Sequence, residues 1–122
     1  NQIWLGKKEG GKGRARVPIN RTLEPVLKAA KAQARTEYVI EYLDRKVGNI
    51  KKAFASAVKA AGLADITPHD LRHTAAVWMA EAGVSMSEIA QYLGHSSSVI
   101  TERVYARYSP EYLRKAASAL DL

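Results

Sequence analysis

The chain has 122 residues, 47% of them hydrophobic, which excludes a disordered protein and fits a single folded domain. Its 19 lysines and arginines outnumber 12 acidic residues, and the net charge of +7 favours a polyanionic partner, nucleic acid above all. The absence of cysteine excludes disulfides, thiolate zinc sites and a cysteine nucleophile. No apolar run approaches the ~20 residues that cross a bilayer. The start at Asn1, without a methionine, suggests a piece of a longer protein.

The first residues have the pattern of a β-hairpin over 2–19. Two extended runs, QIWLGKK (2–8) and RARVPI (14–19), flank a glycine-rich turn, EGGKG. Five basic side chains lie on or near it: Lys7, Lys8, Lys12, Arg14 and Arg16. Such a hairpin can enter a DNA groove or lie along phosphates. Alternatively, its lysines only protect a solvated sheet edge from aggregation.

The rest of the chain has mostly helical patterns. A helix capped by Asn20 is predicted over 20–35, followed by a short strand over 37–42. Five more helices are predicted, over 48–61, 68–82, Ser85 or Ser87 to Gly94, about 98–106 and 110–120. Thr67 is expected to cap the second of these, with Pro68 at its first position. The sequence therefore predicts a mainly α fold with a small antiparallel β-hairpin or sheet, in the α+β class.

Chemistry-bearing residues gather in the stretch TPHDLRHTAA, residues 67–76. His69 and Arg72 are three residues apart and share a helix face. Three apolar residues on a different face are expected to reach the core: Leu71, Ala75 and Trp78. His73 points elsewhere, and it is expected either to flank the His69–Arg72 pair or to pack inward as a structural neighbour.

Two further places carry polar residues. His95 directly follows Gly94, where a helix end can present a side chain. Tyr105 and Tyr108 lie three apart in the amphipathic stretch ERVYARYS. Taken singly, such residues are more often caps or packing than functional groups. A zinc site built from the three histidines is disfavoured, since Arg72 would repel a cation and no carboxylate clearly joins them.

As an ordered set, these residues resemble the tyrosine recombinase (phage integrase) family. TPHDLRHTAA and IAQYLGHSS…TERVYA are similar to its two most recognisable blocks, and a lysine-bearing hairpin precedes both. The resemblance covers essentially the whole chain. It implies a DNA breaking-rejoining enzyme, a site-specific recombinase or integrase, that works through a 3′-phosphotyrosyl intermediate and needs no metal or other cofactor.

The resemblance also implies roles for individual residues. Tyr105 matches the nucleophile, with Tyr108 as competitor and Tyr112 as a remote one. Three side chains are expected around the scissile phosphate: Arg72, His69 and His95. The two histidines would donate a hydrogen bond or shuttle the tyrosine proton. Lys12 is expected to protonate the leaving 5′-oxygen, with Lys8 and then Lys7 as alternatives. The other basic hairpin residues are expected to bind DNA: Lys7, Lys8, Arg14 and Arg16.

Two parts of the family pattern are not found in residues 1–122. They are a further catalytic arginine ahead of the hairpin and an N-terminal DNA-binding domain. We therefore expect a single partial catalytic domain that is inactive or severely impaired alone. The expected partners are double-stranded recombination sites and three further copies in a homotetramer, with no membrane, in a bacterial or phage-encoded cytoplasmic protein. Helix 110–120 would pack either on its own core or in trans on a neighbour.

Three other hypotheses remain open at this point. GVSMSEIAQYLGHSS also resembles a helix-turn-helix segment, which would make the chain a DNA-binding module without chemistry. A type IB topoisomerase would share the tyrosine chemistry, although the compact Leu-Gly-His block and its short spacing to Tyr105 favour a recombinase. A purely structural interaction protein would leave the ordered lysine, histidine, arginine and tyrosine residues unexplained.

Overall fold

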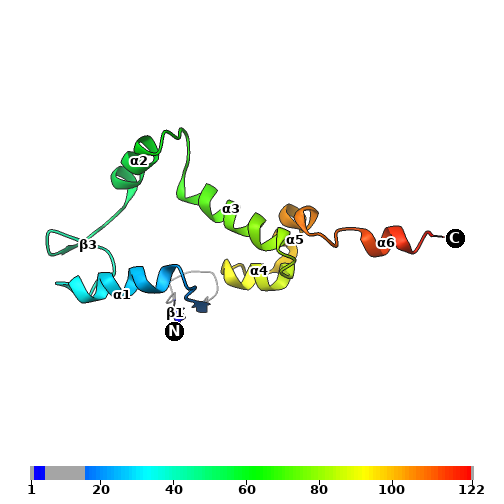
Figure 1. Cartoon of the computed structure of the whole chain (residues 1–122), viewed down its shortest axis with the longest axis horizontal. Coiled ribbons are helices and arrows are strands. Elements are labelled where there is room, and N and C mark those ends of the chain that lie inside the picture. The colour runs from blue at the N-terminus through cyan, green and yellow to red at the C-terminus, as the bar shows by residue number, and fades with distance from the viewer. Residues whose placement is uncertain (1, 5–15, 122) are drawn as a thin grey trace. The chain divides into compact units, whose positions relative to one another are not determined.

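A computed structural model of the chain describes residues 2–4 and 16–121 (Figure 1). Its elements, in order, are β1 (Gln2–Trp4), β2 (Arg16–Pro18), α1 (Leu23–Gln33), β3 (Glu41–Tyr42), β4 (Arg45–Lys46), α2 (Lys51–Ala60), α3 (Pro68–Glu81), α4 (Met86–Tyr92), α5 (Ser98–Tyr105), the 3₁₀ helix η1 (Ala106–Tyr108) and α6 (Arg114–Ser118). Strands β1 and β2 pair with each other, and β3 pairs antiparallel with β4. The predicted mainly α fold with a small antiparallel sheet is confirmed.

The chain divides into two compact units, of which the first contains Pro18–Ile66. Its first helix, α1, is shorter than the predicted span 20–35 and has Thr22 rather than Asn20 as its N-cap. Asn20 still supports the start of the helix, because its side-chain oxygen accepts a hydrogen bond from the Leu23 amide at 2.8 Å. Neither α1 nor α2 contains a buried residue. The strand predicted over 37–42 is wrong in extent, because β3 holds only Glu41 and Tyr42.

The shortened strand has a local cause. The Glu41 carboxylate accepts hydrogen bonds from the backbone amides of Arg35 and Thr36, at 2.9 and 2.8 Å, and from the Thr36 hydroxyl. These bonds hold the preceding residues in a bend, so their strand propensity is not realised. The Thr36 hydroxyl, followed by the Arg35 amide, lowers the pKa of Glu41 below its ordinary value.

The second unit contains Thr67–Leu122 and begins with a capping box on α3. The Asp70 amide donates to the Thr67 hydroxyl oxygen at 3.4 Å, and the Thr67 amide donates to the Asp70 carboxylate at 2.8 Å. Pro68 occupies the first helical position, where its missing N–H costs nothing. The Thr67 hydroxyl, followed by the Thr67 amide, lowers the pKa of Asp70. The predicted start of this helix is confirmed.

Short turns then separate α3, α4 and α5. Gly83 and Gly94 follow α3 and α4 with φ angles of +79° and +70°, a left-handed conformation that glycine adopts without the strain a side chain would bring. Ser85 and Ser97 cap the next helices by accepting hydrogen bonds from the Glu88 and Val99 amides. The three helices are therefore folded back on one another over a short length of chain.

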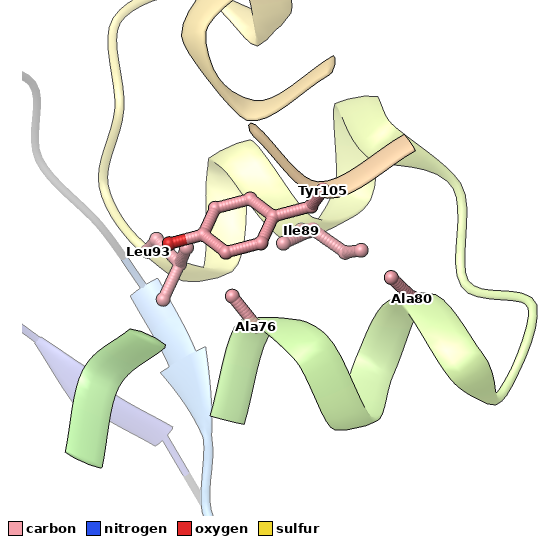
Figure 2. Packing of buried hydrophobic residues seen from close by; sticks show 5 residues of the cluster. All are labelled: Ala76, Ala80, Ile89, Leu93 and Tyr105. Atoms are coloured by element: carbon pink, nitrogen blue, oxygen red, sulfur yellow. The ribbon is translucent and has the colours of Figure 1, made fainter. Parts of the chain in front are cut away.

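The core of the second unit lies where these three helices meet. Its buried members are Ala76, Ala80, Ile89, Leu93 and Tyr105 (Figure 2). The prediction that Leu71 and Trp78 reach the core is wrong, since they are 55% and 68% exposed, whereas Ala75 is half-buried. The helix instead packs through its small alanines, Ala76 and Ala80, which share the buried cluster with the Tyr105 ring.

The last predicted helix is also shorter than expected. It was predicted over 110–120, but α6 begins at Arg114, because Leu113 has a left-handed φ of +59° that interrupts the helical path. Tyr112, Leu113 and Leu120 are all exposed. In the part of the chain that the structure describes, no helix is long and apolar enough to cross a membrane.

Candidate active site

Arg72 ties α3 to the turn between α4 and α5. Its guanidinium donates a hydrogen bond to the backbone carbonyl of Leu93, the residue that ends α4. Leu93 comes two residues before His95, so this bond places Arg72 beside the turn that carries His95. The Arg72 side chain is exposed, and the remaining donors of its planar fork can bind an anion such as phosphate.

His95 is fixed by the two helices that flank it. Its backbone amide donates to the Ala90 carbonyl at 2.8 Å, which closes the end of α4. Its Nδ1 atom lies 2.9 Å from the hydroxyl oxygen of Thr101, which is fully buried in α5. The imidazole is half-buried, so one edge is held by the protein. The predicted position of His95 just after a glycine-ended helix is confirmed.

Tyr105 is the last residue of α5 and is 7% exposed. Figure 2 shows its side chain crossing the face of α3 that carries Ala76 and Ala80, with Ile89 and Leu93 beside it. Its hydroxyl oxygen lies 2.9 Å from Nδ1 of His73, and the two ring centroids are 5.1 Å apart. The phenol is therefore held in one orientation by packing and by one polar contact.

His73 is the site residue that sequence reasoning left aside. It precedes Ala76 by three residues and Ala80 by seven, so it continues the buried stripe of α3 toward the start of that helix. The alternative of packing inward is the one observed, but its partner is the predicted nucleophile. The spacing of His73 from Ala76 and Ala80 is a sequence signal that these residues share a helix face. The larger apolar residues Leu71 and Trp78 instead favoured a different face as the buried one.

His69 and the other two tyrosines have different surroundings. His69 lies exposed on the first turn of α3, beside Asp70. Tyr108 is half-buried against the core, and the Arg107 guanidinium lies 5.1 Å from its ring centroid. Tyr112 is 49% exposed on the segment before α6. Tyr105, by contrast, has its hydroxyl hydrogen-bonded to His73, the residue next to Arg72.

Of the five basic residues predicted on the hairpin, Arg16 is the one that lies within the described residues. Lys7, Lys8, Lys12 and Arg14 lie outside the described residues, while Arg16 is exposed at the start of β2. Within residues 2–4 and 16–121, no group of three or more histidines and carboxylates is arranged to hold a metal ion. The site that can be described is thus formed by α3, the α4–α5 turn and the end of α5.

Comparison with known proteins gives the family. The sequence profile of the phage integrase family matches residues 2–111. The chain belongs to the phage integrase family. Among curated relatives, this integrase-family chain is 34% identical over 115 residues to the tyrosine recombinase XerA of Pyrococcus horikoshii, and 41% identical over 69 residues to the integrase of Salmonella phage P22.

The match to the tyrosine recombinase XerC of Bifidobacterium longum is 45% identical over 58 residues. These alignments cover 88%, 57% and 48% of the integrase-family chain for XerA, the P22 integrase and XerC respectively. They cover 40%, 18% and 16% of those relatives, so the chain spans less than half of their length. No solved structure matches the chain significantly.

Proposed function

We propose that this chain carries the DNA-cleaving centre of a site-specific recombinase. The observation that carries the proposal is the buried Tyr105, whose hydroxyl is held by the residue next to Arg72. Through the carbonyl of Leu93, Arg72 is also linked to the turn that presents His95. A nucleophile, an anion-binding guanidinium and an imidazole are thereby carried by α5, α3 and the α4–α5 turn, which are packed around one core. The names of the relatives, recombinases and integrases, favour this reading over a topoisomerase.

In the proposed reaction, the Tyr105 oxygen attacks a DNA phosphorus atom. The new O–P bond is the 3′-phosphotyrosyl linkage, the bond from phosphorus to the 5′-oxygen breaks, and a 5′-hydroxyl end leaves. Negative charge grows on the non-bridging oxygens, and Arg72 meets it with two parallel donors. His69 and His95 are proposed to add hydrogen bonds to the same oxygens. Because the linkage keeps the bond energy, attack by another 5′-hydroxyl rejoins the strands.

The leaving 5′-oxygen needs a proton, which we propose comes from Lys12, or from Lys8 if the hairpin turn is differently registered. The remaining basic residues of the hairpin, among them the exposed Arg16, are proposed to contact backbone phosphates. Such contacts fix the position of DNA without reading its sequence, and they weaken as salt increases.

We further propose that residues 1–122 are part of one catalytic domain and act as a homotetramer on duplex recombination sites. The exposed apolar residues around α6, which are Tyr112, Leu113 and Leu120, support packing of this segment on a neighbouring copy. A second arginine, supplied from outside residues 1–122, is proposed to complete the phosphate site. Taken alone, residues 1–122 should then be inactive or cleave slowly.

The test is covalent trapping with a pool of random-sequence duplexes that carry one 5′-bridging phosphorothiolate. The 5′-thiolate leaves without being protonated and attacks phosphorus poorly, so a slow enzyme still accumulates its adduct. We expect an adduct that survives denaturation, is lost in Tyr105→Phe and persists in Tyr108→Phe. DNA binding that is equal in all three proteins, without any adduct, would instead support the helix-turn-helix module. Sequencing the trapped DNA would reveal the preferred site.

A further inference from the structure

The contact between His73 and Tyr105 has the geometry of a nucleophile with its base. The Nδ1 atom and the phenolic oxygen are 2.9 Å apart, within the reach that proton transfer requires. The two rings are tilted by 50°, so the imidazole meets the hydroxyl edge-on rather than by stacking. Phenols are almost fully protonated at neutral pH, and attack on phosphorus requires that this proton leave.

The surroundings keep this pair together. His73 is half-buried on the stripe of α3 that also carries Ala76 and Ala80, and the Tyr105 ring rests against both alanines. Because the ring is confined by the core, its hydroxyl cannot move far from Nδ1 without unpacking α5 from α3. The hydrogen bond is therefore a built feature of the second unit and not a chance contact between mobile side chains.

The other two histidines are engaged differently. Nδ1 of His95 lies against the Thr101 hydroxyl, and His69 is exposed one turn before His73. Both had been predicted as shuttles for the tyrosine proton. His73 is the histidine for which the structure records a hydrogen bond to Tyr105.

We infer that His73 is a catalytic residue that accepts the Tyr105 proton during strand cleavage and returns it during rejoining. This assignment rests on the proposed function. In cleavage, the proton moves from the Tyr105 oxygen to Nδ1 while the O–P bond forms and the bond to the 5′-oxygen breaks. In rejoining, the protonated imidazole gives the proton back to the departing phenolate. The neutral ring must then carry its resting proton on Nε2, which leaves Nδ1 free to accept.

The first test reads that tautomer without DNA. The chain has three histidines, so the ring nitrogens of His73 can be assigned by comparing ¹⁵N spectra of the unchanged chain and of His73→Phe. We expect Nδ1 to be the unprotonated nitrogen of the neutral ring, with a signal that shifts in Tyr105→Phe. A neutral ring protonated on Nδ1 would donate to Tyr105 rather than accept, and would overturn the assignment.

The second test separates basicity from positioning. His73→Asn keeps an oxygen that can accept a hydrogen bond from the phenol but cannot take its proton, while His73→Phe keeps only the ring volume. Trapping with the phosphorothiolate duplexes should slow by about 10²–10⁴-fold in both variants. If His73→Asn forms the adduct as fast as the unchanged chain, His73 only positions Tyr105, and the assignment fails while the proposed function stands.

The third test compares rate ratios, so a slight folding defect in His73→Phe cancels out. A ring-fluorinated tyrosine at position 105 is a more acidic phenol and depends less on a base. We expect the rate ratio between the unchanged chain and His73→Phe to shrink by about tenfold or more when Tyr105 is fluorinated in both, because a base contributes least when the proton is already weakly held. An unchanged ratio would refute proton transfer. If the trapped DNA is joined to a residue other than Tyr105, the proposed function itself fails, and the role of His73 fails with it.

Discussion

Replacing Thr101 by valine should misdirect His95 while leaving the fold in place. Thr101 is fully buried in α5, and its hydroxyl oxygen lies 2.9 Å from Nδ1 of His95. Valine has nearly the same shape, so the change removes the polar contact and little of the packing. Serine is the matched control, because Thr101→Ser keeps the hydroxyl and removes the methyl group.

The expected magnitudes follow from burial. Loss of the hydrogen bond to a half-buried imidazole should lower the free energy of unfolding by about 1–2 kcal/mol in Thr101→Val. Loss of one buried methyl should cost about 1 kcal/mol in Thr101→Ser. Both variants should therefore melt several degrees lower, at about 4–8 °C per kcal/mol for a small domain.

The two variants should differ in chemistry. Without the Thr101 contact at Nδ1, the His95 ring is oriented less firmly, and misplacement of this kind costs on the order of 10- to 100-fold in rate. Single-turnover trapping with phosphorothiolate duplexes should show that loss in Thr101→Val and a nearly unchanged rate in Thr101→Ser. Equal rates in the two variants would refute the claim that Thr101 positions His95 for the reaction.

Three other outcomes are expected. The Thr67 hydroxyl and amide lower the pKa of Asp70 in the folded state. The ionised Asp70 should therefore stabilise the fold above its unfolded-state pKa of about 3.9, and this stabilisation should be lost as pH falls through the lower folded-state pKa. Helicity measured by circular dichroism during acid titration should thus depend less on pH in Asp70→Asn, and identical titrations would contradict this role. Removing residues 110–122 should abolish the tetramer on trapped DNA without abolishing the adduct, as read by light scattering, and an unchanged mass would rule out docking through this segment. Millimolar guanidinium should speed adduct formation by residues 1–122 if a missing arginine limits the rate, and equal acceleration by sodium chloride at the same ionic strength would disprove that explanation.

The helix boundaries near the site could be predicted because local chemistry sets them. Thr67 and Pro68 at the start of α3, and the left-handed Gly83 and Gly94 after α3 and α4, act through their own backbone and nearest neighbours. The position of His95 follows directly from Gly94. Such signals do not depend on which tertiary contacts form later.

The packing face of α3 could not be predicted in this way. The helix carries two apolar stripes, and the one with Leu71 and Trp78 offers more surface to bury than the one with Ala76 and Ala80. The structure buries the alanines, because a tyrosine ring from a segment some thirty residues away fits against them. The side-chain sizes on α3 do not reveal the shape of the segment that packs against it. For this reason the hydrogen bond between His73 and Tyr105 could not be predicted.

The starts of β3 and α6 also depend on features that sequence propensity does not capture. The bend before β3 is held by the Glu41 carboxylate, which reaches back to Arg35 and Thr36. The late start of α6 follows from the left-handed backbone conformation of Leu113. Leucine rarely adopts this conformation, and no residue pattern in the sequence predicts it. Propensity alone therefore extended the strand and the helix too far.

The central claim is that Tyr105 is the residue joined to DNA, and tryptic mapping of the trapped adduct tests it most directly. Cleavage after Arg103 and Arg107 releases Tyr105 in the four-residue peptide VYAR, whereas Tyr108 and Tyr112 fall together in YSPEYLR. The nucleotide remnant is expected on VYAR. A remnant on YSPEYLR, with VYAR recovered unmodified, would contradict it.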